Sequence, residues 1–289
     1  MTTETRAPQG RPDRPDPRGS HQPGPDERGV HAPGRAAIPG RHLRTDQWWV
    51  PRSATLVGLL AFIVYSTWRA FEGAHYYAAP YVSPFYSPCL AESCERMPGG
   101  ADWGLFGDWW RLSPALIVLI FPLGFRVTCY YYRKAYYRAF WASPPACGVA
   151  EPHASYSGET RFPLIVQNVH RYFFYVAIPV AAILTYDVAL GFRNADGQWG
   201  HMGLGTLVLL VNVVLIWAYT VSCHSCRHVI GGRLRHFSRH PVRYRAWQWV
   251  SRLNTRHMML AWLSLASVGL ADLYVYLLAS GAFSDPRFF

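Results

Sequence analysis

The stretch LGTLVLLVNVVLIWAYTVSCHSCRH, residues 204–228, joins a long apolar run to a short cluster of cysteines and histidines. Residues 204–221 carry no charged side chain, and this length and polarity are typical of a helix that crosses a bilayer. The six residues from Cys223 to His228 then contain two cysteines and two histidines. His224 and His228 stand four apart, so on a helix both point from one face and can bind one metal ion. The alternative is a helix end where His and Arg side chains bind carbonyl groups and complement the helix dipole.

Similar apolar blocks recur along the chain and predict a membrane protein. The 289 residues are 51% hydrophobic and only 16% charged, and the apolar residues gather in blocks long enough to cross a bilayer. The predicted fold class is an all-α integral membrane protein with one transmembrane domain over residues 46–289. Its five expected spans cover about residues 53–71, 112–132, 166–192, 199–223 and 258–278.

The N-terminal segment has a different composition from the rest of the chain. Residues 1–45 are rich in Pro, Gly, Arg and His and contain almost no large apolar side chains. Such a segment buries too little surface to offset the entropy lost on ordering, so we expect a disordered tail.

The distribution of basic residues predicts the orientation in the membrane. The net charge is +11, and the arginines lie between the apolar blocks rather than on one face of a soluble domain, so no nucleic-acid partner is expected. The basic segments are the tail, residues 133–164, and residues 227–256, which hold eight arginines and no acidic residue. By the positive-inside rule the N-terminus is cytoplasmic and the C-terminus external, in the inner (plasma) membrane of the cell.

This orientation divides the six cysteines into two groups. Cys89 and Cys94 fall in an external loop, where disulfides persist, so we expect a bridge between them. The other four fall at the cytoplasmic side, where thiols stay reduced and clustered cysteines bind metals or carry out redox chemistry. Histidines crowd the same level. We therefore expect the cytoplasmic ends of spans two to five to surround one metal centre, although each residue alone can be a packing or interfacial side chain.

Five segments together resemble a known family. They are RVTCYYYRKAYYR (126–138), PPAC (144–147), QNVHRYF (167–173), CHSCRHVIGG (223–232) and NTRHM (254–258). As a set they resemble, over about residues 46–280, the single-chain, five-helix, cytochrome-b-like membrane anchor of bacterial succinate dehydrogenase (complex II). The resemblance implies that a flavoprotein and an iron–sulfur subunit oxidise succinate on the cytoplasmic side. It also implies that this chain holds them on the membrane and passes electrons to menaquinone or ubiquinone, with the basic loops as a docking surface.

The anchor class that this chain resembles carries a Rieske-type two-iron, two-sulfur cluster in place of haem. Such a cluster takes two cysteines on one iron and two histidines on the other. The preferred ligands are Cys129 and Cys147 on one iron, with His224 and His228 on the other. The first substitutes for members of this set are Cys223 and His170.

Three other expectations accompany this interpretation. Donors of the type that quinone carbonyls need stand at the cytoplasmic level: His257, His170, Arg171, Tyr132 and Trp249. Each of these has interfacial anchoring as its alternative role. A haem b anchor, with His170 and either His224 or His257 as axial ligands, is the nearest rival for the cofactor. A membrane scaffold or transporter with a structural zinc site is the rival from another class, but a transporter would show internal repeats or broken helices at the midplane.

Overall fold

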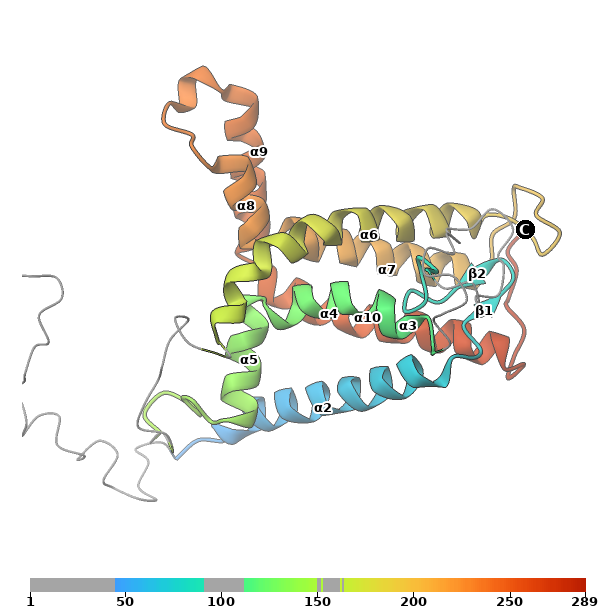
Figure 1. Cartoon of the computed structure of the whole chain (residues 1–289), viewed down its shortest axis with the longest axis horizontal. Coiled ribbons are helices and arrows are strands. Elements are labelled where there is room, and N and C mark those ends of the chain that lie inside the picture. Colours follow the sequence, from blue (N-terminus) through green and yellow to red (C-terminus); the bar gives the residue numbers. More distant parts are fainter. Residues whose placement is uncertain (1–44, 91–111, 150–151, 153–161, 163) are drawn as a thin grey trace, which may run out of the picture.

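Four long apolar helices form a bundle in the computed structural model, which describes residues 45–90, 112–149, 152, 162 and 164–289. These helices are α2 (Trp49–Glu72), α6 (His170–Leu190), α7 (Leu204–Val221) and α10 (His257–Ala279), and each is long and apolar enough to cross a membrane. They lie side by side, and the C-terminus lies at the opposite end of the bundle from the start of α2 (Figure 1). The predicted all-α membrane class is confirmed, whereas the predicted disordered tail lies outside the described residues except for residue 45.

The segment that the sequence predicted as the second span is broken rather than continuous. It consists of α3 (Ala115–Val118), α4 (Ile120–Val127) and α5 (Tyr130–Phe140), and the chain bends by 81° between α4 and α5. The predicted span, about residues 112–132, runs past this bend. The bend has a physical reason, because α5 carries Arg133, Lys134 and Arg138, and charged side chains are costly in hydrocarbon.

Short elements lie at the two ends of the bundle. At the end that the charge pattern assigns to the cytoplasm lie η3 (Leu164–Val169), α8 (His224–Gly231), η4 (Phe237–Arg239) and α9 (Pro241–Asn254). At the external end, β1 (Tyr77–Ala78) and β2 (Tyr81–Val82) pair antiparallel, with Tyr77 opposite Val82. The Tyr81 side chain connects β2 to other segments at this end. Its hydroxyl donates to Asp285 at 2.8 Å and lies 3.1 Å from the Thr206 hydroxyl.

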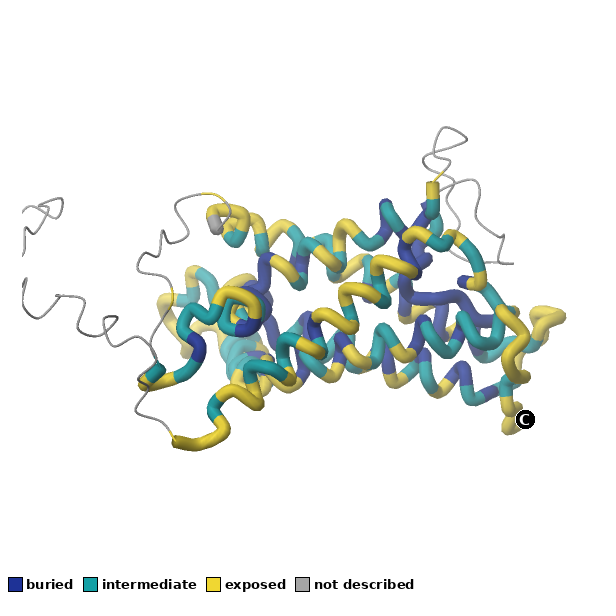
Figure 2. The backbone as a smooth tube through the Cα atoms, turned by 90° about the horizontal axis from the view of Figure 1, so that it is seen from below, coloured by how far each residue is buried: buried dark blue, intermediate teal, exposed yellow. Residues whose placement is uncertain are grey.

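The outer faces of the long helices are apolar and exposed. Exposed residues run along these faces while buried residues line the inside (Figure 2). Val64 of α2, Val214 of α7 and Leu270 of α10 are among the exposed apolar side chains. A soluble protein rarely leaves so much apolar surface uncovered, so these faces are the lipid-facing surface of the bundle.

A fully buried ion pair joins the external ends of α2 and α10. Arg69 Nε donates to Asp272 Oδ2 at 2.8 Å, and both side chains are 0% exposed. The Tyr65 hydroxyl donates to the same carboxylate at 2.5 Å, and the Ser83 hydroxyl donates to its other oxygen. Glu72 binds the other side of the guanidinium at 2.5 Å. A buried charge is tolerated only when it is paired and hydrogen-bonded in this way.

We expect Asp272→Ala to destabilise the protein by about 3 kcal/mol, because it leaves the buried Arg69 guanidinium with Glu72 as its one remaining carboxylate among the described residues. Thermal unfolding of the purified protein in detergent measures the effect. Asp196→Ala, in an exposed turn, is the matched control and should change stability by less than about 0.5 kcal/mol. Equal unfolding temperatures for the two variants would contradict this role of the ion pair.

Candidate functional site

Two breaks in the helices, at Thr128-Cys129 and at Ser222-Cys223, have the same construction. In each, the cysteine is an extended residue immediately before a short helix, with φ −65° and ψ 128° for Cys129 before α5 and φ −65° and ψ 147° for Cys223 before α8. The N–H of Ser225 donates to the Cys223 sulfur at 3.4 Å. Both thiols therefore lie at helix N-termini, where the partial positive charge favours a thiolate or an anionic centre.

His170, the first residue of α6, is held on three sides. Its Nδ1 lies 2.9 Å from Thr128 Oγ1, and its Nε2 lies 3.0 Å from Cys223 Sγ. The Phe125 ring stacks on the imidazole at a centroid distance of 4.9 Å. This histidine therefore contacts the hydroxyl of one break and the thiol of the other.

His257, the first residue of α10, repeats this arrangement with the two breaks exchanged. Its Nδ1 lies 2.8 Å from Ser222 Oγ, and its Nε2 lies 3.4 Å from Cys129 Sγ. The Tyr219 ring stacks on it at 5.1 Å. We call the resulting crossed cluster the Cys/His tetrad, and its members are Cys129, His170, Cys223 and His257.

Three residues before each histidine, an amide side chain donates a hydrogen bond to a carbonyl of the break that the Nδ1 atom of this histidine contacts. Gln167, three residues before His170, donates from Nε2 to the Val127 carbonyl at 3.2 Å. Asn254, three residues before His257, donates from Nδ2 to the Ser222 carbonyl at 2.7 Å. A Gln/Asn-x-x-His segment thus docks on each hydroxyl–cysteine break.

The tetrad is largely withdrawn from water. Cys129 is 3% exposed and Cys223 is 2% exposed, while His257 is buried and His170 is half-buried. Burial disfavours the charged form of a thiol. A bound metal would favour the thiolate, because metal binding to cysteine releases the proton.

The tetrad does not form the shell of a single metal ion. In the part of the chain that the structure describes, no three His, Cys, Asp or Glu side chains are grouped so that they could hold one ion. The tetrad instead consists of two Cys–His contacts, one from each break. Two thiols and two imidazoles are, in type and number, the donors that a Rieske-type two-iron cluster takes.

The predicted ligands are divided by the structure. Cys129 and both substitutes, Cys223 and His170, belong to the tetrad. Cys147 is exposed in the loop after α5, and His224 and His228 are exposed on α8. The structure therefore does not gather the preferred four side chains around one point.

The predicted quinone-binding residues are divided as well. His170 and His257 belong to the tetrad, and Tyr132 lies beside it with its hydroxyl donating to the Ala261 carbonyl at 2.6 Å. Arg171 is exposed on α6 and Trp249 is exposed on α9. None of the five lines the apolar cavity described below.

The expected external disulfide is described only at one of its cysteines. Cys89 is disulfide-bonded, whereas Cys94 lies outside the described residues. The pairing of the two stays a prediction.

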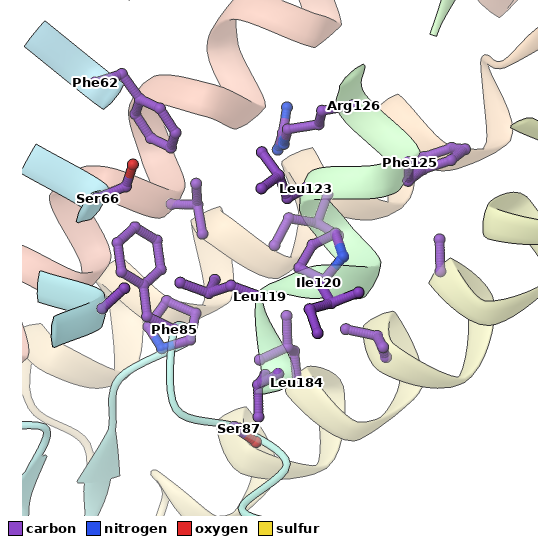
Figure 3. A pocket seen from close by; sticks show the side chains of 18 of the residues that line it. Phe62, Ser66, Phe85, Ser87, Leu119, Ile120, Leu123, Phe125, Arg126 and Leu184 are labelled. Atoms are coloured by element: carbon purple, nitrogen blue, oxygen red, sulfur yellow. The ribbon is translucent and has the colours of Figure 1, made fainter. Parts of the chain in front are cut away.

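An apolar cavity that the sequence did not reveal adjoins the tetrad. It has a volume of about 290 Å³ and lies between α2, α3, α4, α6 and α7 (Figure 3). Phe125 and Tyr219 line it and also stack on the tetrad histidines, so one layer of aromatic rings separates cavity and tetrad. Arg126 lies at one end of the cavity and Ser87 at the other (Figure 3).

Arg126 is the charged group of this cavity. Its Nη1 donates to the Tyr132 hydroxyl at 2.7 Å and to Ser264 Oγ at 3.1 Å. Its guanidinium carbon lies 4.8 Å from the centre of the Tyr219 ring. A lone arginine inside an apolar span is itself a signal of a functional site, and this signal was present in the sequence.

These features define a class: a multi-span helical membrane subunit with a buried Cys/His centre at one end of its bundle. Comparison with known proteins identifies the family. A model of the actinobacterial succinate dehydrogenase subunit SdhC matches residues 50–281, and the chain belongs to this family. It is thus a membrane-anchor subunit of succinate dehydrogenase in the bacterial plasma membrane, and the predicted resemblance is confirmed.

A solved structure agrees with the family assignment. The chain is 54% identical to a chain of the Mycobacterium smegmatis Sdh1 complex in the apo form, with a TM-score of 0.79. The similarity covers 90% of this chain and 99% of that chain. A search of curated protein sequences gives no significant match.

Differences in burial predict the order in which the cysteines react. At neutral pH a maleimide should label exposed Cys147 first, while Cys129 and Cys223 stay unlabelled until the protein is denatured. Peptide mass spectrometry after timed labelling, with and without a chelator, measures the rates. Labelling of Cys223 as fast as Cys147 would contradict the buried tetrad.

Proposed function

We propose that this subunit passes electrons to quinone through a Rieske-type two-iron, two-sulfur cluster held by the Cys/His tetrad. Membership of the SdhC family gives it the flavoprotein and iron–sulfur subunits of succinate dehydrogenase as partners. The observation that carries the proposal is the crossed tetrad, in which two thiols and two imidazoles from four chain segments meet in a buried site. When bound, a cluster of this kind supplies one-electron transfer.

The residues around the tetrad fit such a cofactor. Thr128 and Ser222 occupy the Nδ1 atoms of the two histidines and leave each Nε2 directed at a thiol. A hydrogen bond at one ring nitrogen fixes the tautomer and the orientation of a histidine that binds metal through the other. The helix N-termini behind both sulfurs favour anionic ligands.

This proposal changes the ligand set that the sequence favoured. Cys129 stays a ligand, and Cys223 takes the place of Cys147. His170 and His257 take the place of two histidines that are exposed on α8. The cluster is preferred to haem b because each tetrad histidine directs its Nε2 at a cysteine.

The apolar cavity beside the tetrad supports a quinone site there. Its lining is mostly hydrocarbon, as the apolar body of a quinone requires, and Arg126 is a cationic donor at the end nearest the tetrad. Phe125 and Tyr219 exclude water between the cavity and the tetrad. In this arrangement Arg126 orients a quinone carbonyl, and its bonds to Tyr132 and Ser264 hold the guanidinium in place. Menaquinone and ubiquinone share the carbonyl chemistry involved.

Substitution of the tetrad tests the ligand assignment. We expect Cys223→Ser and His257→Ala each to abolish the electron paramagnetic resonance signal of the histidine-ligated two-iron cluster in the purified complex, while the signals of the iron–sulfur subunit stay. Quinone reduction should be lost as well, while the soluble subunits still oxidise succinate with an artificial acceptor.

The matched controls are Cys147→Ser and His224→Ala, which change the same residue types at exposed positions. Both should keep the signal and the quinone reduction. A signal that survives in the tetrad variants but is lost in these controls would restore the ligands favoured by the sequence.

Filling the cavity tests the quinone site separately. Ala177 lines the cavity, and Ala177→Phe should raise the KM for quinone about tenfold or more because the ring occupies the space that quinone needs. Val211→Phe, on the exposed face of α7, is the control and should leave the KM unchanged. Steady-state kinetics with succinate and a soluble quinone analogue provide the measurement, and equal KM values in the two variants would place quinone elsewhere.

A further inference from the structure

The α8–α9 arm, residues 224–254, has no role in the electron transfer proposed above. It extends from the cytoplasmic end of the bundle at a steep angle to the long helices and passes beyond α6 on the side away from α2 (Figure 1). A segment that leaves a transmembrane bundle in this direction runs along the membrane surface. Tyr172, Tyr175 and Ile178 of α6 are exposed, which is consistent with lipid beside this helix.

The arm is a fixed unit rather than a loose loop. Arg243 donates to the Gly232 carbonyl at 2.5 Å and also to the Ile230 carbonyl. Arg227 donates to Ser251 Oγ at 3.1 Å and lies 5.2 Å from the centre of the Trp247 ring. These two arginines hold α8 against α9, and their guanidinium groups already have hydrogen-bond partners within the arm.

The other arginines of this region face solvent. Their guanidinium groups make no hydrogen bond or ion pair with residues 45–90, 112–149 or 164–289. The segment from 227 to 256 contains no acidic residue that could neutralise them. The exposed arginines are Arg233, Arg235, Arg239, Arg245, Arg252 and Arg256.

Large apolar side chains are exposed beside these arginines. Val242 is 78% exposed and Trp249 is 54% exposed. On α9, Val242, Arg245, Trp249 and Arg252 follow one another at spacings of three and four, so they share one face. Arginine with tryptophan on one exposed face is typical of helices at the boundary between headgroups and acyl chains.

We propose that the α8–α9 arm binds anionic phospholipid headgroups of the cytoplasmic leaflet. The exposed guanidinium groups pair with lipid phosphates, and Val242 and Trp249 enter the boundary with the acyl chains. Positive charge without internal counter-ions complements the negative charge of this leaflet. The position of the arm beyond α6 (Figure 1) favours lipid over a protein partner, because α6 exposes apolar side chains of the kind that face a bilayer.

The test uses the complete complex in nanodiscs of phosphatidylcholine, with and without phosphatidylglycerol. The variant is the triple substitution Arg239→Gln, Arg245→Gln and Arg252→Gln, and the control replaces the same three residues by Lys. Native mass spectrometry counts the phosphatidylglycerol retained after detergent extraction. We expect the wild type and the Lys control to retain this lipid selectively and the Gln variant to show about 100-fold weaker preference for it.

A second measurement needs no variant. Hydrogen exchange in residues 233–256 of the wild-type complex should slow when phosphatidylglycerol is present and recover at high salt, because surface electrostatic binding is screened.

Several results would overturn the proposal. An unchanged lipid preference in the Gln variant excludes an anionic-lipid site. A hydrogen-exchange rate that is the same with and without phosphatidylglycerol excludes it as well. Loss of the soluble subunits from the Gln variant with its lipid preference intact makes the arm a protein-docking surface. Equal protection by inorganic phosphate makes it a site for soluble anions.

Discussion

Within a bilayer every backbone N–H and C=O needs a partner inside the protein, and this requirement shapes the whole structure. A continuous helix satisfies this requirement with its own hydrogen bonds. A break leaves backbone carbonyls that need other donors. Here the breaks after α4 and α7 are closed by side chains. Thr128 Oγ1 donates to the Gly124 carbonyl at 2.6 Å, and Ser222 Oγ donates to the Tyr219 carbonyl at 2.9 Å. The amides of Gln167 and Asn254 bind the next free carbonyls. The side chains that end the helices are thus also those that orient the tetrad histidines.

Much of the fold could be predicted from hydropathy and charge. The spans near α2, α6, α7 and α10 follow from apolar length alone, and the level at which cysteines and histidines gather follows from the ends of those spans. The Cys–His contacts of the tetrad could not be predicted in this way. The i, i+4 spacing of His224 and His228 assumes that they face the site, but the extended backbone at Cys223 redirects α8 and leaves both exposed. The same event at Cys129 turned an expected straight helix into the 81° bend.

The sequence nevertheless contained the pattern of the site in a form that periodicity does not detect. Thr-Cys at 128–129 and Ser-Cys at 222–223 are the two hydroxyl–cysteine pairs, and Gln-x-x-His at 167–170 and Asn-x-x-His at 254–257 are the segments that dock on them. The crossing of thiols between the breaks is a property of the tertiary fold, because it depends on how α6 and α10 stand beside α4 and α7. Arg126 belongs to the same category, since only the fold places it at the end of a cavity.

The crossed geometry also limits how chain length can vary in related proteins. In each break the hydroxyl contacts one tetrad histidine and the thiol contacts the other. The rotation of the break about the helix axis is therefore fixed by two histidines. Adding or removing one residue in α4 or α7 would turn the break by about 100° and separate it from both histidines. The turn after α6 has no such constraint. Insertions and deletions should therefore accumulate in the external connections and be absent from the helices that lead to the tetrad.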